Sequence, residues 1–352
     1  MKSEIVEFLA CPVSGTPLEL HIDEQHDDEI ISGSLTTPDR EHTYPIVRGI
    51  PRLLVDFSED EDKVKTQSSF STKWDHIPNF GFDGATRQHF LDWYLDRQGF
   101  GDQNGIIEFL KTRRFILDAG TGVGRDASFF GECAPHATVF GIDLSSSVEH
   151  AYKNTLDYPG VHILQADLTR LPFRHDFFDY LSCDQVLHHT PNTHESFKKL
   201  IPFVAPEGQL AIYVYRVKAP IREFCDDMLR EHYTEAPEAE VYEFSEAMTL
   251  LGKALSELNV KIKIEKPIPL LGFEAGEFDL QRWIYYNMFK CYWNENFSME
   301  TNIAVNFDWY HPRHAFRHTE EEVRSWFAEA GFEMINFSVV PAGISARGRR
   351  YS

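Results

Sequence analysis

The sequence predicts an α/β fold, with a doubly wound parallel sheet, a small β-rich module before it and a helical insert within it. The first observation is the stretch ILDAGTGVGRDASFF, 116–130, where an apolar run ends in an aspartate, alternate glycines follow, and helix-forming residues come next. The second is the alternation of apolar strands and helical segments from residue 113 onward, which is typical of parallel sheets covered by helices on both faces. The third is a break in that alternation over 217–316, a stretch rich in Glu, Phe, Tyr and Trp.

Composition narrows the class of protein. The chain has 352 residues and an aromatic content of 14%, which suits a large core, and it lacks the roughly 18 uninterrupted apolar residues of a membrane helix. The N-terminus shows no basic-then-apolar signal peptide, and five scattered cysteines fit reduced thiols, so we expect a soluble, cytoplasmic protein. The formal net charge of −21 counts against nucleic acid as a partner, because that affinity rests largely on Lys and Arg displacing counterions.

Four parts follow one another along the chain. Short alternating runs with Pro and Gly at turns open it, and the acidic run Ser58–Lys63 is expected to be a solvated linker. Helical spacing after this run predicts a helical lid, and Thr319 with Glu322 forms a capping box that starts the last helix. The predicted parts are the N-terminal module 1–56, the linker and lid 57–112, the core 113–216 with 317–352, and the acceptor-binding insert 217–316.

The glycine loop indicates which ligand the sheet holds. Ligands of such sheets bind at the carboxyl ends of the strands, where the strand order reverses. Gly120, Gly122 and Gly124 read G-x-G-x-G, and Arg125 occupies the place of the third glycine in a dinucleotide fingerprint. Asp118 precedes the loop, where its carboxylate would repel a pyrophosphate and attract a cationic amino group.

Two more aspartates follow the next two strands. Asp143 lies 19 residues past Gly124, where a carboxylate takes ribose hydroxyls, and Asp167 is placed to receive an adenine amine. A ligand with an ammonium, a ribose and an adenine, but no phosphate, is S-adenosylmethionine. The alternative is that Asp143 and Asp167 only cap the helices that follow them.

The stretches ILDAGTGVGR, VFGIDLS, ILQADLTRLPF, FDYLSCDQVLHHT and APEGQLAIYVY carry a resemblance over 113–216 and 317–352. In this order they are similar to the motifs of the class I S-adenosylmethionine-dependent methyltransferases, with Thr121 where the usual loop has a cysteine. The resemblance implies a Rossmann-like, seven-stranded sheet and S-adenosylmethionine as cofactor. It implies these cofactor-binding residues: Asp118, Gly120, Thr121, Gly122, Gly124, Arg125, Asp143, Leu144, Asp167, Leu168 and Asp184.

An aromatic segment before the core adds two residues to the cofactor set. Phe70 and Trp74, in FSTKW, resemble a segment that covers the cofactor in relatives of this type. An aromatic face near a sulfonium cation is physically favourable. Ordinary core packing of both side chains is the alternative.

The N-terminal module has a resemblance of its own. LACPVSGTPLEL and YPIVRGIPRLL look like the Trm112-like zinc-ribbon family, which carries C-P-x-C and further cysteines. This chain keeps Cys11 but has Ser14 at the second cysteine position, and its next cysteine is Cys133. One thiolate cannot build a tetrahedral zinc site, although histidines could substitute. We therefore expect a docking or lid module without a metal.

The residues on the acceptor side are predicted from strand ends and from aromatic density. His188 and His189 follow the fourth strand, beside the expected methyl group, so either is a candidate general base; the alternative is that both orient backbone. Arginines 216, 313 and 347 could bind an acidic group on the acceptor, or could be surface residues. The candidate substrate-binding residues are Tyr213, Tyr215, Arg216, Trp309, Tyr310, Arg313 and His318.

These observations predict methyl transfer from S-adenosylmethionine to a small-molecule acceptor, such as a metabolite, sugar, lipid or natural-product intermediate. An RNA- or protein-modifying methyltransferase is the alternative, as is a cofactor-binding partner subunit, because a Trm112-like unit is similar to modules that partner such enzymes. The acidic charge and the lack of a basic stripe count against RNA. The sequence leaves the acceptor atom and the oligomeric state open.

Overall fold

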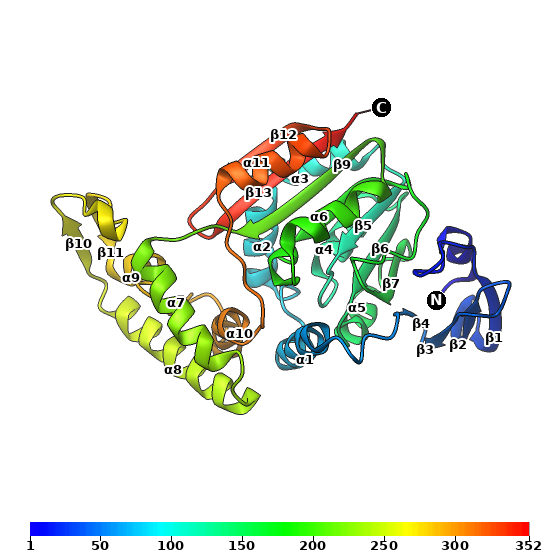
Figure 1. Cartoon of the computed structure of the whole chain (residues 1–352), viewed down its shortest axis with the longest axis horizontal. Coiled ribbons are helices and arrows are strands. Elements are labelled where there is room, and N and C mark those ends of the chain that lie inside the picture. The colour runs from blue at the N-terminus through cyan, green and yellow to red at the C-terminus, as the bar shows by residue number, and fades with distance from the viewer. Residues whose placement is uncertain (352) are drawn as a thin grey trace.

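The computed structural model describes residues 1–351 and is built around one twisted sheet of eleven strands (Figure 1). The strand order is β1-β2-β3-β4-β7-β6-β5-β8-β9-β13-β12. Strands β4 to β9 pair in parallel, and β13 lies antiparallel between β9 and β12. The strands of this sheet are β1 (Glu19–His26), β2 (Glu29–Thr36), β3 (Thr43–Val47), β4 (Ile50–Leu53), β5 (Phe115–Ala119), β6 (Thr138–Asp143), β7 (Val161–Ala166), β8 (Phe178–Asp184), β9 (Val204–Tyr215), β12 (Phe332–Val339) and β13 (Gly343–Arg350).

Helices cover both faces of the sheet, as the alternation of segments predicts. Successive side chains of a strand point to opposite faces, so Leu117 of β5 packs with Phe197 and Trp326 on one face, while Ile116 packs with Tyr94 on the other. The α-helices are α1 (Glu61–His76), α2 (Gly84–Arg97), α3 (Gln103–Leu110), α4 (Arg125–Cys133), α5 (Val148–Asn154), α6 (Thr193–Leu200), α7 (Pro220–Tyr233), α8 (Glu238–Glu257), α9 (Leu280–Asn287), α10 (Met299–Tyr310) and α11 (Glu320–Glu329).

The N-terminal module extends the central sheet. The seven predicted core strands are present, but the sheet continues beyond β7 because β4 pairs with it in parallel, through Arg52 beside Gln165 and Leu53 beside Ala166. Ile50 is buried against residues of α5 and β7. The module therefore shares one hydrophobic core with the rest of the chain.

The cysteine of this module is part of that core. Cys11 is buried, and its Sγ lies 3.1 Å from the Tyr44 hydroxyl. Within residues 1–351, no group of three or more His, Cys, Asp or Glu side chains is arranged to hold a metal ion.

The two connecting regions differ in detail from the predictions. The acidic run is not all linker: Asp60 caps α1 by accepting from the Lys63 amide, and the helix begins at Glu61. The insert contains a hairpin of β10 (Lys261–Ile264) and β11 (Gly276–Asp279) besides its helices. The capping box at Thr319 is confirmed. In the described part of the chain, no helix combines the length and apolar character needed to cross a membrane.

Candidate active site

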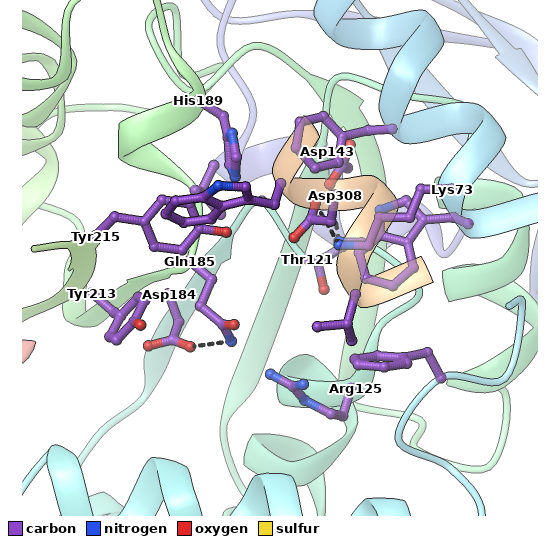
Figure 2. Close-up of a pocket in the computed structure, with 18 of the residues that line it drawn as sticks. Lys73, Thr121, Arg125, Asp143, Asp184, Gln185, His189, Tyr213, Tyr215 and Asp308 are labelled. Atoms are coloured by element: carbon purple, nitrogen blue, oxygen red, sulfur yellow. Dashed lines mark hydrogen bonds and ion pairs between the residues drawn. The ribbon is translucent and has the colours of Figure 1, made fainter. Parts of the chain in front are cut away.

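A cavity of about 440 Å³ lies at the carboxyl ends of the parallel strands (Figure 2). Its floor is the loops after β5, β6, β7 and β8 and the end of β9. Its other walls come from α1, α2 and the helical insert. The volume and the mixture of aromatic and charged lining suit a small-molecule site.

The glycine loop forms the base of this cavity, directly beneath α1. Gly120 and Gly122 have φ values of +88° and +56°, which favour glycine. A Cβ on Gly120 would lie 2.3 Å from Val186, and one on Gly122 would lie 2.8 Å from the Trp74 indole. Glycine is therefore favoured at both positions, by the backbone conformation and by the close approach of Val186 and Trp74. Gly124 starts α4 behind the loop and does not line the cavity.

Asp143 holds the loop and also faces the cavity. Its Oδ2 accepts from the Gly122 amide at 2.9 Å, and its Oδ1 accepts from the amide and hydroxyl of Ser145 at 2.8 and 2.7 Å. A carboxylate has about four acceptor sites, so Oδ2 keeps one for a further donor. Turn capping and ligand binding are thus compatible at Asp143.

Asp167 has a similar double arrangement, with a cation added. Its Oδ1 accepts from the amide and hydroxyl of Thr169, at 2.8 and 2.7 Å, and its Oδ2 accepts from Lys63 Nζ at 2.7 Å. Lys63 comes from the start of α1, so this ion pair ties α1 to the end of β7. Leu144 and Leu168, the next residues after the two aspartates, also line the cavity.

Asp118 requires a correction, because it does not line the cavity. It is 2% exposed, and its Oδ2 accepts from the Thr121 hydroxyl at 2.6 Å, which turns the carboxylate back into the protein. Burial and the neighbouring charge of Asp126 raise the pKa of Asp118 to about 8. Asp126 itself reaches the cavity, paired with Arg125 at 2.7 Å. A cationic ligand group would therefore meet Thr121 and Asp126 first.

Asp184, at the end of β8, is clamped by an arginine from α2. Arg97 donates to both carboxylate oxygens at 2.6 and 2.5 Å, and its guanidinium stacks over Trp93 at 4.0 Å. Burial alone would raise the pKa of Asp184, but the Arg97 charge outweighs it and lowers that pKa below its usual range. Gln185 adds a hydrogen bond at 3.0 Å (Figure 2).

The two adjacent histidines have different environments. His189 lines the cavity, and its Nδ1 lies 2.7 Å from the His314 carbonyl, which assigns the proton to Nδ1 and leaves Nε2 as an acceptor. Burial lowers the pKa of His189 to about 4. His188 is fully buried with its ring 3.7 Å from that of Tyr215 and does not line the cavity, so in this structure it is not placed to act as a base there.

The predicted acceptor-side residues divide into two groups. Tyr213, Tyr215 and Trp309 line the cavity. The other predicted residues do not line the cavity: Arg216, Tyr310, Arg313 and His318, together with Arg347.

Each of these outlying side chains has a structural explanation. Tyr310 follows Trp309 on α10, where successive side chains diverge by about 100°, and its hydroxyl donates to the Lys290 carbonyl at 2.7 Å. Arg313 pairs with Asp62 at 2.6 Å. His318 packs edge-on against Trp326 of α11, and the backbone of Arg216 forms an isolated β-bridge with the backbone of His318. Arg347 is buried and donates to Gln209 and to a backbone carbonyl.

The covering segment lies against the cavity and adds a cation that the sequence did not reveal. Phe70 and Trp74 of α1 both line the cavity. Lys73 lies 4.2 Å from the Trp74 ring centroid and pairs with Asp308 of α10 at 2.9 Å (Figure 2). This ion pair joins the lid to the insert. The aromatic face beside the glycine loop thus already accommodates a positive charge.

Other cavity residues that sequence reasoning missed come from α2 and the insert. Their only sequence signal is aromatic and basic density. They are Trp93, Lys218, Arg222, Arg282, Tyr285, Tyr286, Lys290, Tyr292 and Asp308.

Comparison with known proteins agrees with this geometry. Residues 117–212 match the family described as "Methyltransferase domain", and residues 2–49 match the family described as "Trm112p-like protein". The chain is 27% identical over 183 residues to "Methyltransferase str2" of Strobilurus tenacellus, covering 47% of this chain and 65% of that protein. It is 30% identical over 136 residues to an uncharacterised Synechococcus protein, covering 37% and 30%. The chain thus spans less than two thirds of the length of these curated relatives.

Among solved structures, the magnesium protoporphyrin IX methyltransferase of Synechocystis PCC 6803 with bound SAH is 15% identical to this chain. The superposition covers 82% of this chain and 100% of that one, with a TM-score of 0.44. This similarity is too distant to add to the fold described above.

Together with the doubly wound sheet, the match of residues 117–212 identifies this part of the chain as a methyltransferase domain, whose cofactor is S-adenosylmethionine. In this chain a Trm112p-like domain precedes that methyltransferase domain and is built into the same sheet.

The residues present fit this cofactor. Asp126, Asp143 and Asp167 place carboxylates along the cofactor side of the cavity, which suits an ammonium and ribose hydroxyls. Trp74 adds an aromatic face suited to a sulfonium.

Proposed function

We propose that this protein transfers the methyl group of S-adenosylmethionine to a small molecule bound between the sheet edge and the helical insert. One observation carries the proposal: a single cavity is lined on one side by the glycine loop and Asp143, and on the other by residues of α9 and α10. A cofactor on the loop and an acceptor against the insert would therefore share one enclosed space, with the reacting atoms held close.

When bound, the cofactor supplies an electrophilic methyl group. The chain's residues supply position and proton transfer. Trp74 and Phe70 cover the loop, and the Lys73–Asp308 ion pair closes the cover against the insert and so excludes water. For an acceptor whose atom must lose a proton, we assign His189 Nε2 as the general base, because Nδ1 is fixed on the His314 carbonyl.

The match of residues 2–49 to Trm112p-like proteins favours a second candidate, modification of RNA or protein. Two observations count against it. None of the cavity-lining residues comes from the N-terminal module, which instead completes the sheet at β7. The chain is also strongly acidic, with a net charge of −21.

Incubation with S-adenosylmethionine carrying a deuterated methyl group tests the choice. The purified protein is given separate small-molecule, RNA and protein fractions of a cell extract, and each fraction is analysed by mass spectrometry. We expect the labelled methyl group in a small molecule. Label confined to RNA or protein supports the second candidate, and label in no fraction contradicts methyl transfer.

A further inference from the structure

The insert side of the cavity carries cations that the protein itself does not neutralise. Lys218, Arg282 and Lys290 all line the cavity, and none of them has a carboxylate within 4.0 Å among the described residues. Lys218 Nζ donates to two backbone carbonyls at 2.6 Å, and Arg282 donates to one at 3.2 Å. In a chain with a net charge of −21, such a local excess of positive charge stands out.

Lys290 is the least satisfied of these cations. Its residue is 5% exposed, and no acceptor of the described chain lies within hydrogen-bonding distance of its Nζ. The ammonium lies 5.0 Å from the Trp309 ring centroid, on the cavity wall. Its backbone is fixed, because the Tyr310 hydroxyl donates to its carbonyl at 2.7 Å. The ammonium therefore opens onto the cavity with its hydrogen-bonding capacity unused by the protein, where a group that enters the cavity can meet it.

The neighbouring carboxylates lie beyond ion-pair distance of Lys290 and are paired with other cations. Asp308 is paired with Lys73 at 2.9 Å, and Asp226 is paired with Arg222 at 2.6 Å. These two ion pairs leave Lys290 without a carboxylate, as they do Lys218 and Arg282. Burial lowers the pKa of Lys290 to about 7, as expected for an ammonium held without an anion.

The shape and polarity of the wall restrict the anion further. Tyr285, Tyr286 and Trp309 present rings to the cavity from the insert, and Trp93 does so from α2. Flat apolar molecules pack well against such rings. Lys218 and Arg282 already donate to backbone carbonyls, so Lys290 is the cation with a bond left to make, which one carboxylate can satisfy. A doubly charged phosphate would be repelled more strongly by the neighbouring Asp308.

We propose that the acceptor is an aromatic or conjugated small molecule that carries a carboxylate, and that Lys290 Nζ binds this carboxylate from the insert side of the cavity. This assignment rests on the function proposed above. It differs from the sequence-based expectation of an anion site at arginines 216, 313 and 347, none of which lines the cavity.

Calorimetry on the full-length protein saturated with S-adenosylhomocysteine tests the assignment. The probes are matched pairs that differ only in charge: benzoate and benzamide, cinnamate and cinnamamide, 2-naphthoate and 2-naphthamide, with phenyl phosphate as a dianion. The proteins are the wild type, Lys290→Met, and the matched control Lys266→Met, which alters an exposed lysine of the same insert. Melting temperatures show whether each variant is folded.

We expect at least one acid to bind the wild type about tenfold or more tightly than its amide, since a hydrogen bond to a charged group is worth about 1.5–3 kcal/mol. Lys290→Met should lose that preference while binding S-adenosylhomocysteine as before, and Lys266→Met should keep it. Four results overturn the assignment: no acid preferred over its amide, a preference that survives in Lys290→Met, phenyl phosphate preferred over benzoate, or weaker S-adenosylhomocysteine binding by Lys290→Met. The last would place the cofactor's own carboxylate on Lys290.

Failure of this proposal is distinguishable from failure of the proposed function. Labelled small molecules combined with no preference for acids reject only the carboxylate. Absence of label from every small molecule rejects the function itself.

Discussion

On the sheet side of the cavity, Asp143, Asp167 and Asp184 each have partners within the protein, whereas on the insert side Lys290 has none. The charges on the sheet side are therefore partnered before any ligand binds and hold loops and helices in place, although Asp143 Oδ2 keeps one acceptor site for a ligand. The insert side keeps an unmatched charge that only a ligand can satisfy. Removing a charge should therefore have different consequences on the two walls. On the sheet side it should lower stability or weaken cofactor binding. On the insert side it should weaken acceptor recognition and leave stability unchanged.

The largest effect on activity is expected where the two walls meet, at His189. Its Nδ1 is fixed by the His314 carbonyl, after α10, and its ring lies 5.0 Å from that of Phe70 on α1. For an acceptor that must lose a proton, His189→Gln should lower kcat by about 10²-fold, the lower end of the usual contribution of a general base because its pKa is only about 4, with cofactor affinity unchanged. Steady-state kinetics on the labelled product measures this effect.

His188→Phe is the matched control, because His188 is buried behind the wall and contacts Tyr215. Its activity should fall only as far as its folded fraction falls. Equal losses of kcat in both variants at full folding would show that His189 is not the base.

The next effect tests the completeness of the sheet side. Arg97→Met leaves the Asp184 carboxylate buried without its two charge-assisted bonds. Breaking a buried pair at one partner costs about 3–5 kcal/mol of unfolding free energy. Denaturant titration measures the loss, and the double variant Arg97→Met/Asp184→Leu, which removes both charges, should recover part of it. A single variant as stable as the wild type would show that the clamp is not structural.

Cofactor affinity at Asp143 should change somewhat less. Asp143→Ala removes the free acceptor site on Oδ2 and the bond to the Gly122 amide. We expect S-adenosylhomocysteine binding to weaken by about 1.5–3 kcal/mol, because hydrogen bonds to a charged group are lost. Calorimetry measures this effect, with Asp143→Asn as the control that keeps an acceptor oxygen. Unchanged affinity in the alanine variant would remove Asp143 from the cofactor site.

The same contrast explains how much of the site the sequence could predict. Parallel strands end at one edge of the sheet, so the loop glycines, Asp143 and Asp184 could be placed together from strand order alone. Side-chain direction within the loop could not be predicted, which is why Asp118 was expected to face a ligand that its bond to Thr121 turns it away from.

Prediction was weakest at contacts between segments far apart in the chain. The Lys73–Asp308 pair and the Arg97–Asp184 clamp each depend on how a helix packs against a distant element, and no local pattern encodes that packing. On α10, aromatic density identified the correct helix but not its inward face, so Trp309 was placed correctly and Tyr310 was not. The continuation of the sheet from β7 to β4 was missed for the same reason.

The smallest expected effect is on the pH dependence of stability, where one group changes the free energy of unfolding by about 1.4 kcal/mol or less per pH unit. This dependence distinguishes the insert wall, with its unpaired Lys290, from the sheet wall. Lys290 has a pKa of about 7 in the folded protein, against about 10.4 in the unfolded chain. Between these values the unfolded state binds more protons, so this residue makes the free energy of unfolding rise with pH.

The groups facing Lys290, which are Lys73 with Asp308 and Arg222 with Asp226, are ion pairs that Lys290→Met leaves in place. Asp118, with a pKa of about 8 in the folded state, works in the opposite direction below that pH, so only the difference between variants is informative. Denaturant titrations at pH 7.0, 7.75 and 8.5 should show Lys290→Met at least as stable as the wild type at pH 7, with the gap closing as pH rises. A gap that stays constant, or a variant clearly less stable at pH 7, would mean that the insert wall is as internally matched as the sheet wall.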